Sequence, residues 1–315
     1  MKTLRCGRFL VPLGRRTLIM GILNVTPDSF SDGGRFFHPG RAVAQALQMQ
    51  EEGADLIDIG GESTRPGARP VSAREEMKRI LPVIERLSAR LRIPISVDTS
   101  KALVARRAIL AGACLINDVT ALRDPKMPEV VAQAGVPVIL MHTRGTPRSM
   151  RRLARYRRLL PEILAELKQS IQKALNAGIR KDRILIDPGI GFAKGPEDSL
   201  QILRHLRAFK RLGFPMVVGP SRKSFIGYIL ERPFSARGGL AFGGDSVRGS
   251  TGSPRTGNPG HPEHVEADRP AQDRLFGTAA AVACAAAQGA EILRVHDVAA
   301  MRQVADLAQA IAQAE

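Results

Sequence analysis

The hydrophobic positions of this sequence follow one repeating pattern: an amphipathic stretch with helical spacing, then a glycine, then a short and almost continuously apolar run. The pattern occurs six times, with its glycines at Gly53, Gly112, Gly135, Gly178, Gly213 and Gly289. A glycine just past a helix end adopts the left-handed conformation without steric cost. A continuously apolar run is typical of a strand that is covered on both faces. The pattern therefore predicts six helix–strand units.

Two further apolar runs, residues 17–23 and 93–97, lack the preceding glycine and bring the predicted strands to eight. Strands that are separated by helices are expected to be parallel, because a parallel return needs a crossover. Eight such units in a single domain, residues 1–315, favour a (β/α)8 TIM barrel of the α/β class. A doubly wound open sheet is the alternative, but it would usually carry a glycine-rich turn after its first strand. Here that turn is NVTPDSF, which begins at Asn24.

Polar oxygens occur at or near the ends of four of these apolar runs, on Asp58, Asp98, Asn117 and Asp187. A carboxylate beside a core is unfavourable unless it is paired or used. The carboxyl ends of barrel strands converge on one mouth, where active sites lie, so these side chains are predicted to line one pocket. The alternative is that each caps the following helix, and we prefer such a cap or loop role for Asp118.

One segment, residues 237–272, does not fit the repeat. Glycine and proline make up a third of it, and apolar residues are sparse. Such a composition cannot bury enough apolar surface to offset the entropy of ordering. We therefore predict a disordered, low-complexity insertion within the barrel domain, and its deletion is expected to leave activity largely unchanged.

Composition changes this picture little. The net charge of +17 suggests nucleic acid as a partner, but the chain has no Trp and only two Tyr on which bases could stack. The densest basic cluster, residues 144–167, carries an apolar stripe at helical spacing from Leu153 to Leu167, so we prefer a helix with a solvated arginine face. Three widely spaced cysteines and the lack of a long apolar run predict a soluble, cytoplasmic protein.

Basic and polar side chains follow the last two predicted strands. In GPSRKSFIG, residues 219–227, Ser221 could cap a short helix whose N-terminus, with Lys223, would attract an anion. Arg294 and His296 alternate on the last strand and should point the same way, which suits a phosphate-type anion. With carboxylates at its floor and cations at its rim, the pocket would suit a flat ligand with N–H donors at one end and an anionic group at the other.

Seven segments, in order along the chain, resemble the dihydropteroate synthase family of pterin-binding enzymes: MGILNVTPDSFSDGG, DIGGESTRPGA, SVDTSK, IND, DPGIGFAK, GPSRKSFIG and RVHDV. The resemblance covers nearly the whole chain apart from the insertion. It implies a TIM-barrel transferase of folate biosynthesis that condenses 6-hydroxymethyl-7,8-dihydropterin pyrophosphate with 4-aminobenzoate, giving 7,8-dihydropteroate and pyrophosphate. It further implies a homodimer and an Mg2+-assisted, SN1-like displacement of pyrophosphate, with sulfonamides binding in the 4-aminobenzoate site.

The resemblance also implies roles for individual residues, carried over position by position. The pterin would be bound by Asp98, Asn117, Asp187 and Lys223, and the pyrophosphate by Asn24, Arg65, Arg294 and His296. The 4-aminobenzoate site would be formed by Phe30, Thr64, Pro66, Phe192 and Ser221. The catalytic residues would be Asp98, Lys223 and Asn24, and Asn24 would also bind Mg2+.

Two other functions are compatible with parts of the pattern. A pterin-binding methyltransferase domain shares the barrel but has no pyrophosphate to bind. Pyrophosphate release that depends on 4-aminobenzoate, against methyl transfer to a corrinoid protein, separates the two. A basic, RNA-associated relative without catalysis would show steeply salt-dependent RNA binding. We expect small-molecule substrates, no specific nucleic acid and no membrane.

Overall fold

The computed structural model describes residues 2–26, 39–65, 67–231 and 270–314. Their central feature is a sheet of eight parallel strands in the order β8-β7-β6-β5-β4-β3-β10-β9. A parallel bridge between Ile186 and Met216 joins the two outer strands, so the sheet is nearly closed. The strands are β3 (Leu18–Asn24), β4 (Leu56–Gly60), β5 (Ile95–Asp98), β6 (Leu115–Asp118), β7 (Val138–Met141), β8 (Ile184–Asp187), β9 (Val217–Val218) and β10 (Ile292–Val295). The predicted TIM barrel is confirmed, as are its eight predicted strands.

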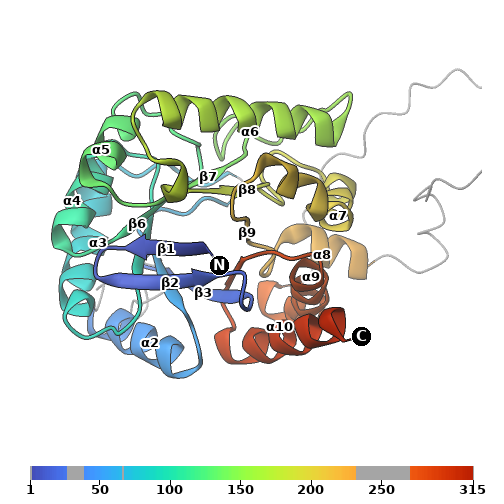
Figure 1. Ribbon diagram of the computed structural model, residues 1–315, viewed down its shortest axis with the longest axis horizontal. Coiled ribbons are helices and arrows are strands. Elements are labelled where there is room, and N and C mark those ends of the chain that lie inside the picture. The colour runs from blue at the N-terminus through green and yellow to red at the C-terminus, as the bar shows by residue number, and fades with distance from the viewer. Residues whose placement is uncertain (1, 27–38, 66, 232–269, 315) are drawn as a thin grey trace, which may run out of the picture.

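Helices surround the strands on all sides (Figure 1). Helix α3 (Ala73–Ser88) shows how the sequence sets one of them. Ser72 Oγ accepts the N–H of Glu75 at its start, and its buried face includes Ile80, Ile84 and Leu87. The described α-helices are α2 (Pro39–Glu51), α3 (Ala73–Ser88), α4 (Ala102–Ala111), α5 (Met127–Ala134), α6 (Leu159–Asn176), α7 (Pro196–Arg204), α8 (Ser224–Leu230), α9 (Leu275–Ala287) and α10 (Val298–Gln313). Short 3-10 helices are η1 (Lys181–Arg183), η2 (Leu206–Leu212) and η4 (Ala271–Arg274).

The six glycines of the repeat all have positive φ, as predicted. Gly112 shows why the position needs glycine. It ends α4 with a φ of 118°, and a Cβ there would lie 2.4 Å from Ser88 Cβ. Both the left-handed backbone and the close approach of α3 therefore exclude a larger residue.

Each strand has one face toward the helices and one toward the barrel interior. On β4, Ile57 and Ile59 belong to the core between sheet and helices, whereas Leu56 belongs to a separate interior cluster. Asp58 lies between these two isoleucines and so faces inward with Leu56. The same alternation gives every strand an inward row, and this row carries the polar residues near the carboxyl ends.

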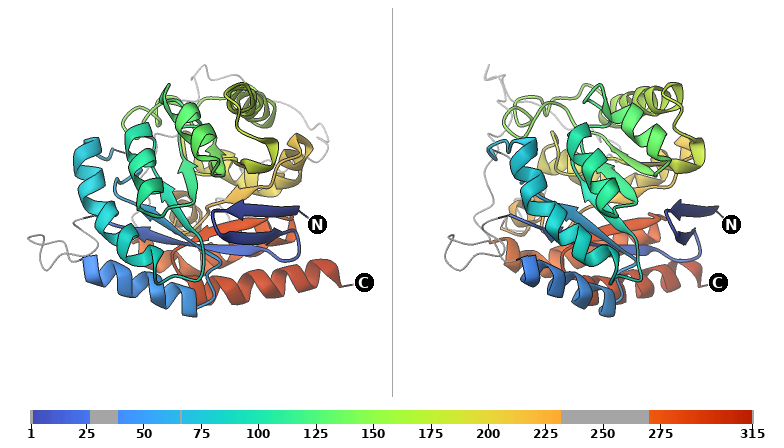
Figure 2. Two further views of the ribbon diagram at one scale, coloured as in Figure 1. Left: turned by 60° about the vertical axis from the view of Figure 1, so that its left-hand side comes forward. Right: turned by 90° about the vertical axis from the view of Figure 1, so that its left-hand side faces the viewer.

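A β-hairpin precedes the barrel, and our sequence analysis did not predict it. Strands β1 (Lys2–Cys6) and β2 (Phe9–Leu13) pair antiparallel. The hairpin lies across the centre of the view in Figure 1, and Figure 2 places it at the end of the barrel where α10 ends. Its alternating buried side chains, Leu4 and Cys6 on β1 with Val11 and Leu13 on β2, join the interior cluster. The hairpin thus closes the amino-terminal end of the barrel.

Three sequence-based expectations concern the basic stretch, the insertion and membrane-spanning helices. The basic stretch 144–167 is not one helix, because α6 begins only at Leu159, and Leu153 lies in a turn with 44% of its surface exposed. The predicted insertion at 237–272 lies almost entirely outside the described residues, which resume at Pro270. No described helix has the length and apolarity needed to cross a membrane.

Candidate active site at the carboxyl ends of the strands

The inward polar residues of neighbouring strands lie at one level. Parallel pairing sets Asn24 beside Gly60, Gly60 beside Asp98, and Asp98 beside Asn117. Asp98 and Asn117 are nearly buried, with 8% and 4% of their surface exposed. Three of the predicted site residues, Asn24, Asp98 and Asn117, are therefore brought together by strand register alone.

Arg294, on β10, ties this level together. Its Nε donates to Asp58 Oδ2 over 2.6 Å, and its Nη2 donates to Asp98 Oδ2 over 2.9 Å. Asn117 Nδ2 donates to the same Asp58 oxygen over 3.0 Å. A buried carboxylate is tolerated when it is paired and hydrogen-bonded, so Asp58 is the residue that holds Arg294 and Asn117 in place. Our sequence analysis placed Asp58 in the pocket but gave it no role.

The acidic groups have unusual ionisation because they are buried. Burial raises the pKa of Asp98 to about 7, although the Arg294 charge opposes this shift, and the Asp58 charge adds to it. Burial also raises the pKa of Asp187, at the end of β8, while the Gly189 N–H, which donates to Asp187 Oδ1 over 2.7 Å, lowers it. Carboxylates that are poorly solvated are ready to accept hydrogen bonds from a ligand with N–H groups.

Lys223 adds a cationic group to the acidic residues of this cluster. Its Nζ is 3.7 Å from the centroid of the Phe192 ring, a cation–π contact. Burial and the Arg294 charge lower the pKa of Lys223 to about 7, whereas the Asp187 and Asp98 charges oppose the shift. Two predicted site residues, Phe192 and Lys223, are thus in direct contact, and Lys223 is within electrostatic reach of both carboxylates.

His296 and Ser221 form a hydrogen-bonded pair. Ser221 Oγ accepts the His296 backbone N–H over 3.1 Å and lies 2.9 Å from His296 Nδ1. When the serine hydroxyl donates to Nδ1, the imidazole proton is on Nε2. Burial and the Arg294 and Arg222 charges lower the pKa of His296 to about 3. His296 is therefore a neutral hydrogen-bond donor rather than a second cation.

Ser221 is not a helix cap, which corrects the sequence-based expectation. Helix α8 starts at Ser224 with Lys223 at its N-cap position and no side-chain cap bond. Ser221 instead pairs with the strand that follows in space, β10, which a sequence pattern does not report. The adjacent Arg222 has a positive φ of 56° and pairs in bidentate fashion with Asp297, so its charge is already partly neutralised.

The loop after β4 carries Thr64, which is half-buried, and Arg65, which is exposed. Thr64 and Arg65 remain at the rim, and within the described part of the chain no hydrogen bond or ion pair joins them to the buried cluster. Phe30 and Pro66, the other two residues predicted for this region, lie outside the described residues.

Asp118 faces the other way. Its Oδ1 accepts the N–H and hydroxyl of Thr120, and its Oδ2 accepts the Leu122 N–H over 2.7 Å. This loop role is the one preferred from sequence, and it follows from the alternation that turns Asn117 inward and Asp118 outward.

The oxygen donors beside Gly60 fit an Mg2+ ion. A Cβ on Gly60 would lie 4.0 Å from Asn24 Oδ1 and 3.9 Å from Asp98 Oδ2, so the missing side chain leaves room next to two hard donors. No group of three or more His, Cys, Asp or Glu side chains suited to a metal occurs among the described residues. Mg2+ commonly uses one or two protein oxygens and completes its shell with water and substrate phosphates, so Asn24, alone or with Asp98, would supply enough protein donors.

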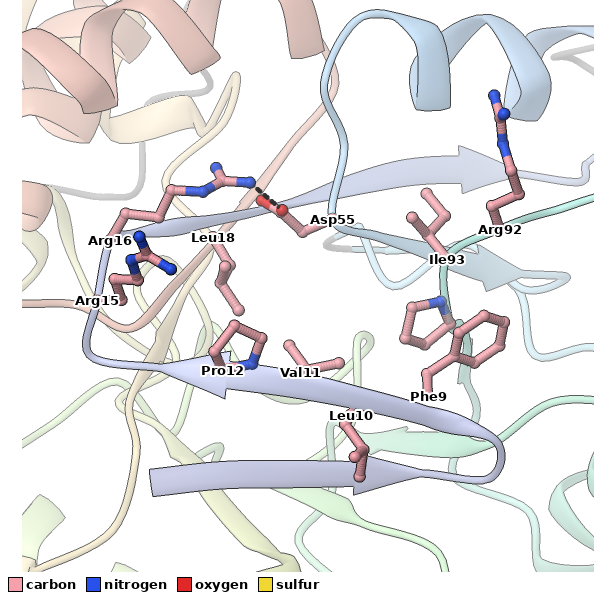
Figure 3. A pocket seen from close by; sticks show the side chains of 11 residues that line it. Phe9, Leu10, Val11, Pro12, Arg15, Arg16, Leu18, Asp55, Arg92 and Ile93 are labelled. Atoms are coloured by element: carbon pink, nitrogen blue, oxygen red, sulfur yellow. Dashed lines mark hydrogen bonds and ion pairs between the residues drawn. The ribbon is translucent and has the colours of Figure 1, made fainter. Parts of the chain in front are cut away.

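A groove of about 540 Å³ lies elsewhere, beside the hairpin (Figure 3). Phe9, Val11 and Leu18 supply part of its apolar lining, and Arg16 at its edge is paired with Asp55 over 2.5 Å. It belongs to the amino-terminal end of the barrel, whereas the polar cluster lies at the carboxyl ends of the strands. The groove is therefore separate from the candidate site.

Comparison with known proteins shows the family to which this chain is similar. Residues 20–296 match the family of pterin binding enzymes. The chain is 44% identical to the dihydropteroate synthase of Synechocystis sp. over 306 residues, 97% of this chain and 93% of that protein. It is 43% identical to the dihydropteroate synthase of Bacillus subtilis over 295 residues, 93% of this chain and 87% of that protein.

Solved structures of such enzymes share the fold. Xanthomonas albilineans dihydropteroate synthase with 4-aminobenzoic acid gives a TM-score of 0.83 at 41% identity, covering 100% of this chain and 99% of that one. The same enzyme in complex with 7,8-dihydropteroate gives 0.80 at 39% identity, covering 99% and 100%. A sulfonamide drug complex of the Yersinia pestis enzyme gives 0.83 at 38% identity, covering 99% and 100%.

Proposed function

The chain belongs to the dihydropteroate synthase family of pterin-binding enzymes, and on this premise we propose how its site performs the reaction of that family. The reaction is the condensation of 6-hydroxymethyl-7,8-dihydropterin pyrophosphate with 4-aminobenzoate, which yields 7,8-dihydropteroate and pyrophosphate. This makes the protein a transferase of folate biosynthesis. The observation that carries the proposal is the buried cluster of Asp58, Asp98, Asn117 and Arg294, held by bonds between β4, β5, β6 and β10.

The pterin end of the substrate fits the acceptor side of the cluster. An aminopyrimidine edge offers several N–H donors, and Asp98, Asn117 and Asp187 offer oxygens at the strand ends. Each charge-assisted hydrogen bond to a carboxylate contributes about 1.5–3 kcal/mol. Lys223, with its Nζ over the Phe192 ring, would contact the acceptor atoms of the pterin. The pterin would thus supply the hydrogen-bond partners that these buried groups do not obtain from water.

The pyrophosphate end requires donors, and Arg294 with the neutral His296 supplies them from the same strand. Arg65, exposed at the rim, would add a second guanidinium. Asn24 would hold Mg2+ through Oδ1, and the bound ion would neutralise charge on the departing pyrophosphate. These donors matter most as charge develops on the leaving group.

We propose that the displacement is SN1-like. The bond between the pterin methylene carbon and oxygen breaks first, and its electron pair leaves with pyrophosphate. The Asp98 carboxylate then stabilises the pterin cation, after which the 4-aminobenzoate nitrogen attacks the methylene and its proton passes to solvent. Thr64, Phe192 and Ser221, with Phe30 and Pro66, would form the site for 4-aminobenzoate, where a sulfonamide would compete. We also propose a cytoplasmic homodimer.

A coupled assay tests the function directly. Pyrophosphate release would be measured with the pterin pyrophosphate alone, with 4-aminobenzoate alone, and with both, each with and without Mg2+. We expect release only with both substrates and a large loss on removing Mg2+. Release that ignores 4-aminobenzoate would contradict the proposal. Sedimentation velocity of the full chain tests the homodimer.

A further inference from the structure

A buried ammonium group lies behind the candidate site, on the loop that follows β8. Lys194 has only 6% of its surface exposed. Its Nζ is 2.9 Å from His142 Nδ1, 3.2 Å from the His142 carbonyl oxygen and 2.8 Å from the Phe192 carbonyl oxygen. An ammonium has three donors, and all three are used here. Lys194 therefore ties its own loop to the end of β7 and to Phe192.

The contact fixes the imidazole as well. Because Lys194 donates to Nδ1, the His142 proton is on Nε2, which donates to Glu166 Oε2 on α6 over 3.0 Å. Burial lowers the pKa of His142 to about 4, and the His142 hydrogen bond, together with Arg144, lowers that of Glu166 to about 2. A directed chain of donors runs from Lys194 through neutral His142 to an ionised carboxylate.

The loop from Pro188 to Lys194 packs directly against this chain. A Cβ on Gly189 would lie 2.0 Å from the His142 carbonyl oxygen, so the loop backbone packs on the residue that follows β7. Tyr156 adds a second tie, because its hydroxyl donates to the Ala193 carbonyl over 3.0 Å. The carbonyl groups of both Phe192 and Ala193 are thus held by side-chain donors.

The same loop carries the Phe192 ring, over which Lys223 Nζ lies. We infer that Lys194 is a positioning residue for the 4-aminobenzoate site: it holds Phe192, through its carbonyl and through His142, in the orientation that carries Lys223. The inference rests on the proposed function. It assigns a role to a lysine that makes no contact with the reacting atoms, and that the sequence analysis left without one.

The charges around Lys194 are consistent with this role. Asp187, Asp198 and Glu166 favour the ammonium form and Lys223 opposes it, while burial, the largest influence, lowers the pKa of Lys194 to about 7. The three carbonyl or imidazole acceptors and the nearby carboxylates offset part of the cost of burying the ammonium form. Its removal would leave those acceptors without a donor.

Lys194→Met tests the inference, since it keeps length and burial but removes the donors. We expect the KM for 4-aminobenzoate to rise about tenfold and kcat to change less than about twofold, the size expected when buried acceptors lose their donor. Tyr156→Phe keeps the fold with less risk and should raise the same KM about threefold. Lys173→Met is the matched control, because Lys173 also donates to a backbone carbonyl, that of Leu122, away from this loop.

Two readouts separate this inference from the proposed function. In NMR titrations, Lys194→Met should raise the pKa of His142, and hydrogen exchange of residues 188–193 should become faster. If the wild type is active, a raised KM of the Lys194→Met variant together with faster exchange supports the inference, and an unchanged KM overturns it. If the wild type shows no turnover, the proposed function fails. Hydrogen exchange then decides alone: faster exchange in the loop supports positioning by Lys194, and unchanged exchange overturns it.

Discussion

The two ends of the barrel are built from the same strands and the same inward positions, yet they differ in chemistry. At the amino-terminal end the inward residues are apolar, including Leu18, Leu56 and Leu115, and the β1–β2 hairpin packs on them. Along the same strands, Asn24, Asp58, Asp98 and Asn117 follow toward the carboxyl ends. One end is thus filled and closed, whereas the other gathers buried polar groups around Arg294.

The difference shows where folding free energy is gained and where it is lost. The closed end buries whole leucine and isoleucine side chains, each contributing about 1.5–3 kcal/mol. At the mouth, burial raises the pKa of Asp98 and lowers that of Lys223, each to about 7. The charged forms of groups with such pKa shifts are less stable in the folded protein than they would be in water. The closed end stabilises the fold, and the mouth uses part of that stability for binding.

Asp98→Ala is expected to have the largest effect on turnover. It removes the carboxylate that pairs with Arg294 and faces the developing cation, so kcat/KM should fall about 10²–10³-fold. Since the folded state raises the pKa of Asp98, its ionised form is destabilising at pH 8, but the substitution also removes one carboxylate partner of the buried Arg294. These effects oppose each other, so the melting temperature should change little. Pyrophosphate release and thermal melting measure the two effects. Turnover within about tenfold of wild type would remove Asp98 from the mechanism.

Lys223→Ala should come next. Losing a charge-assisted contact of about 1.5–3 kcal/mol raises the KM for the pterin pyrophosphate about 10–100-fold. The control is Lys210→Ala at the closed end, which removes only an exposed pair with Glu291 and should leave KM unchanged. Equal effects of the two variants would erase the functional distinction between the ends.

The pH profile sharpens the comparison with a smaller effect. Asp98 loses its charge as the pH falls below about 7 and Lys223 loses its charge as the pH rises above about 7. The kcat/KM for the pterin pyrophosphate should therefore be bell-shaped with a maximum near pH 7, falling up to about tenfold per unit on either side. Asp98→Asn should remove the acidic limb. An acidic limb that persists in this variant would assign the titration to another group.

Leu115→Ala should have the smallest effect on turnover. Leu115 is fully buried in the interior cluster, and its truncation should lower the free energy of unfolding by about 2–5 kcal/mol. At 25 °C the kcat should remain within about twofold of wild type, because the mouth residues lie on the next inward level. Urea unfolding and the coupled assay measure both quantities. A loss of turnover larger than the loss of stability explains would show that the two ends are coupled.

Much of this architecture could be predicted from local pattern. Side chains alternate between the two faces of a strand, which places Asp98, Asn117 and Arg294 on the inward face, and the six glycines mark helix ends. Both properties depend on neighbours within a few residues. The β1–β2 hairpin was missed although Leu4, Cys6, Val11 and Leu13 alternate, since a short hairpin acquires its stability from the barrel it covers. The 144–167 helix was extended too far, because Met150 is buried from a turn and Tyr156 bonds to the Ala193 carbonyl from a loop, contacts that helical spacing alone does not reveal.

The sequence by itself determined the eight strands, the face on which each side chain lies and, through its resemblance to known enzymes, the family. Only the tertiary structure decided the partners: Arg294 with Asp58, 236 residues away, Ser221 with His296 rather than with a helix end, and Lys194 with His142. The physical reason is that periodicity is set by the backbone over a few residues. Hydrogen-bond partners and pKa values instead depend on distances between strands and on burial, which exist only after the barrel has closed.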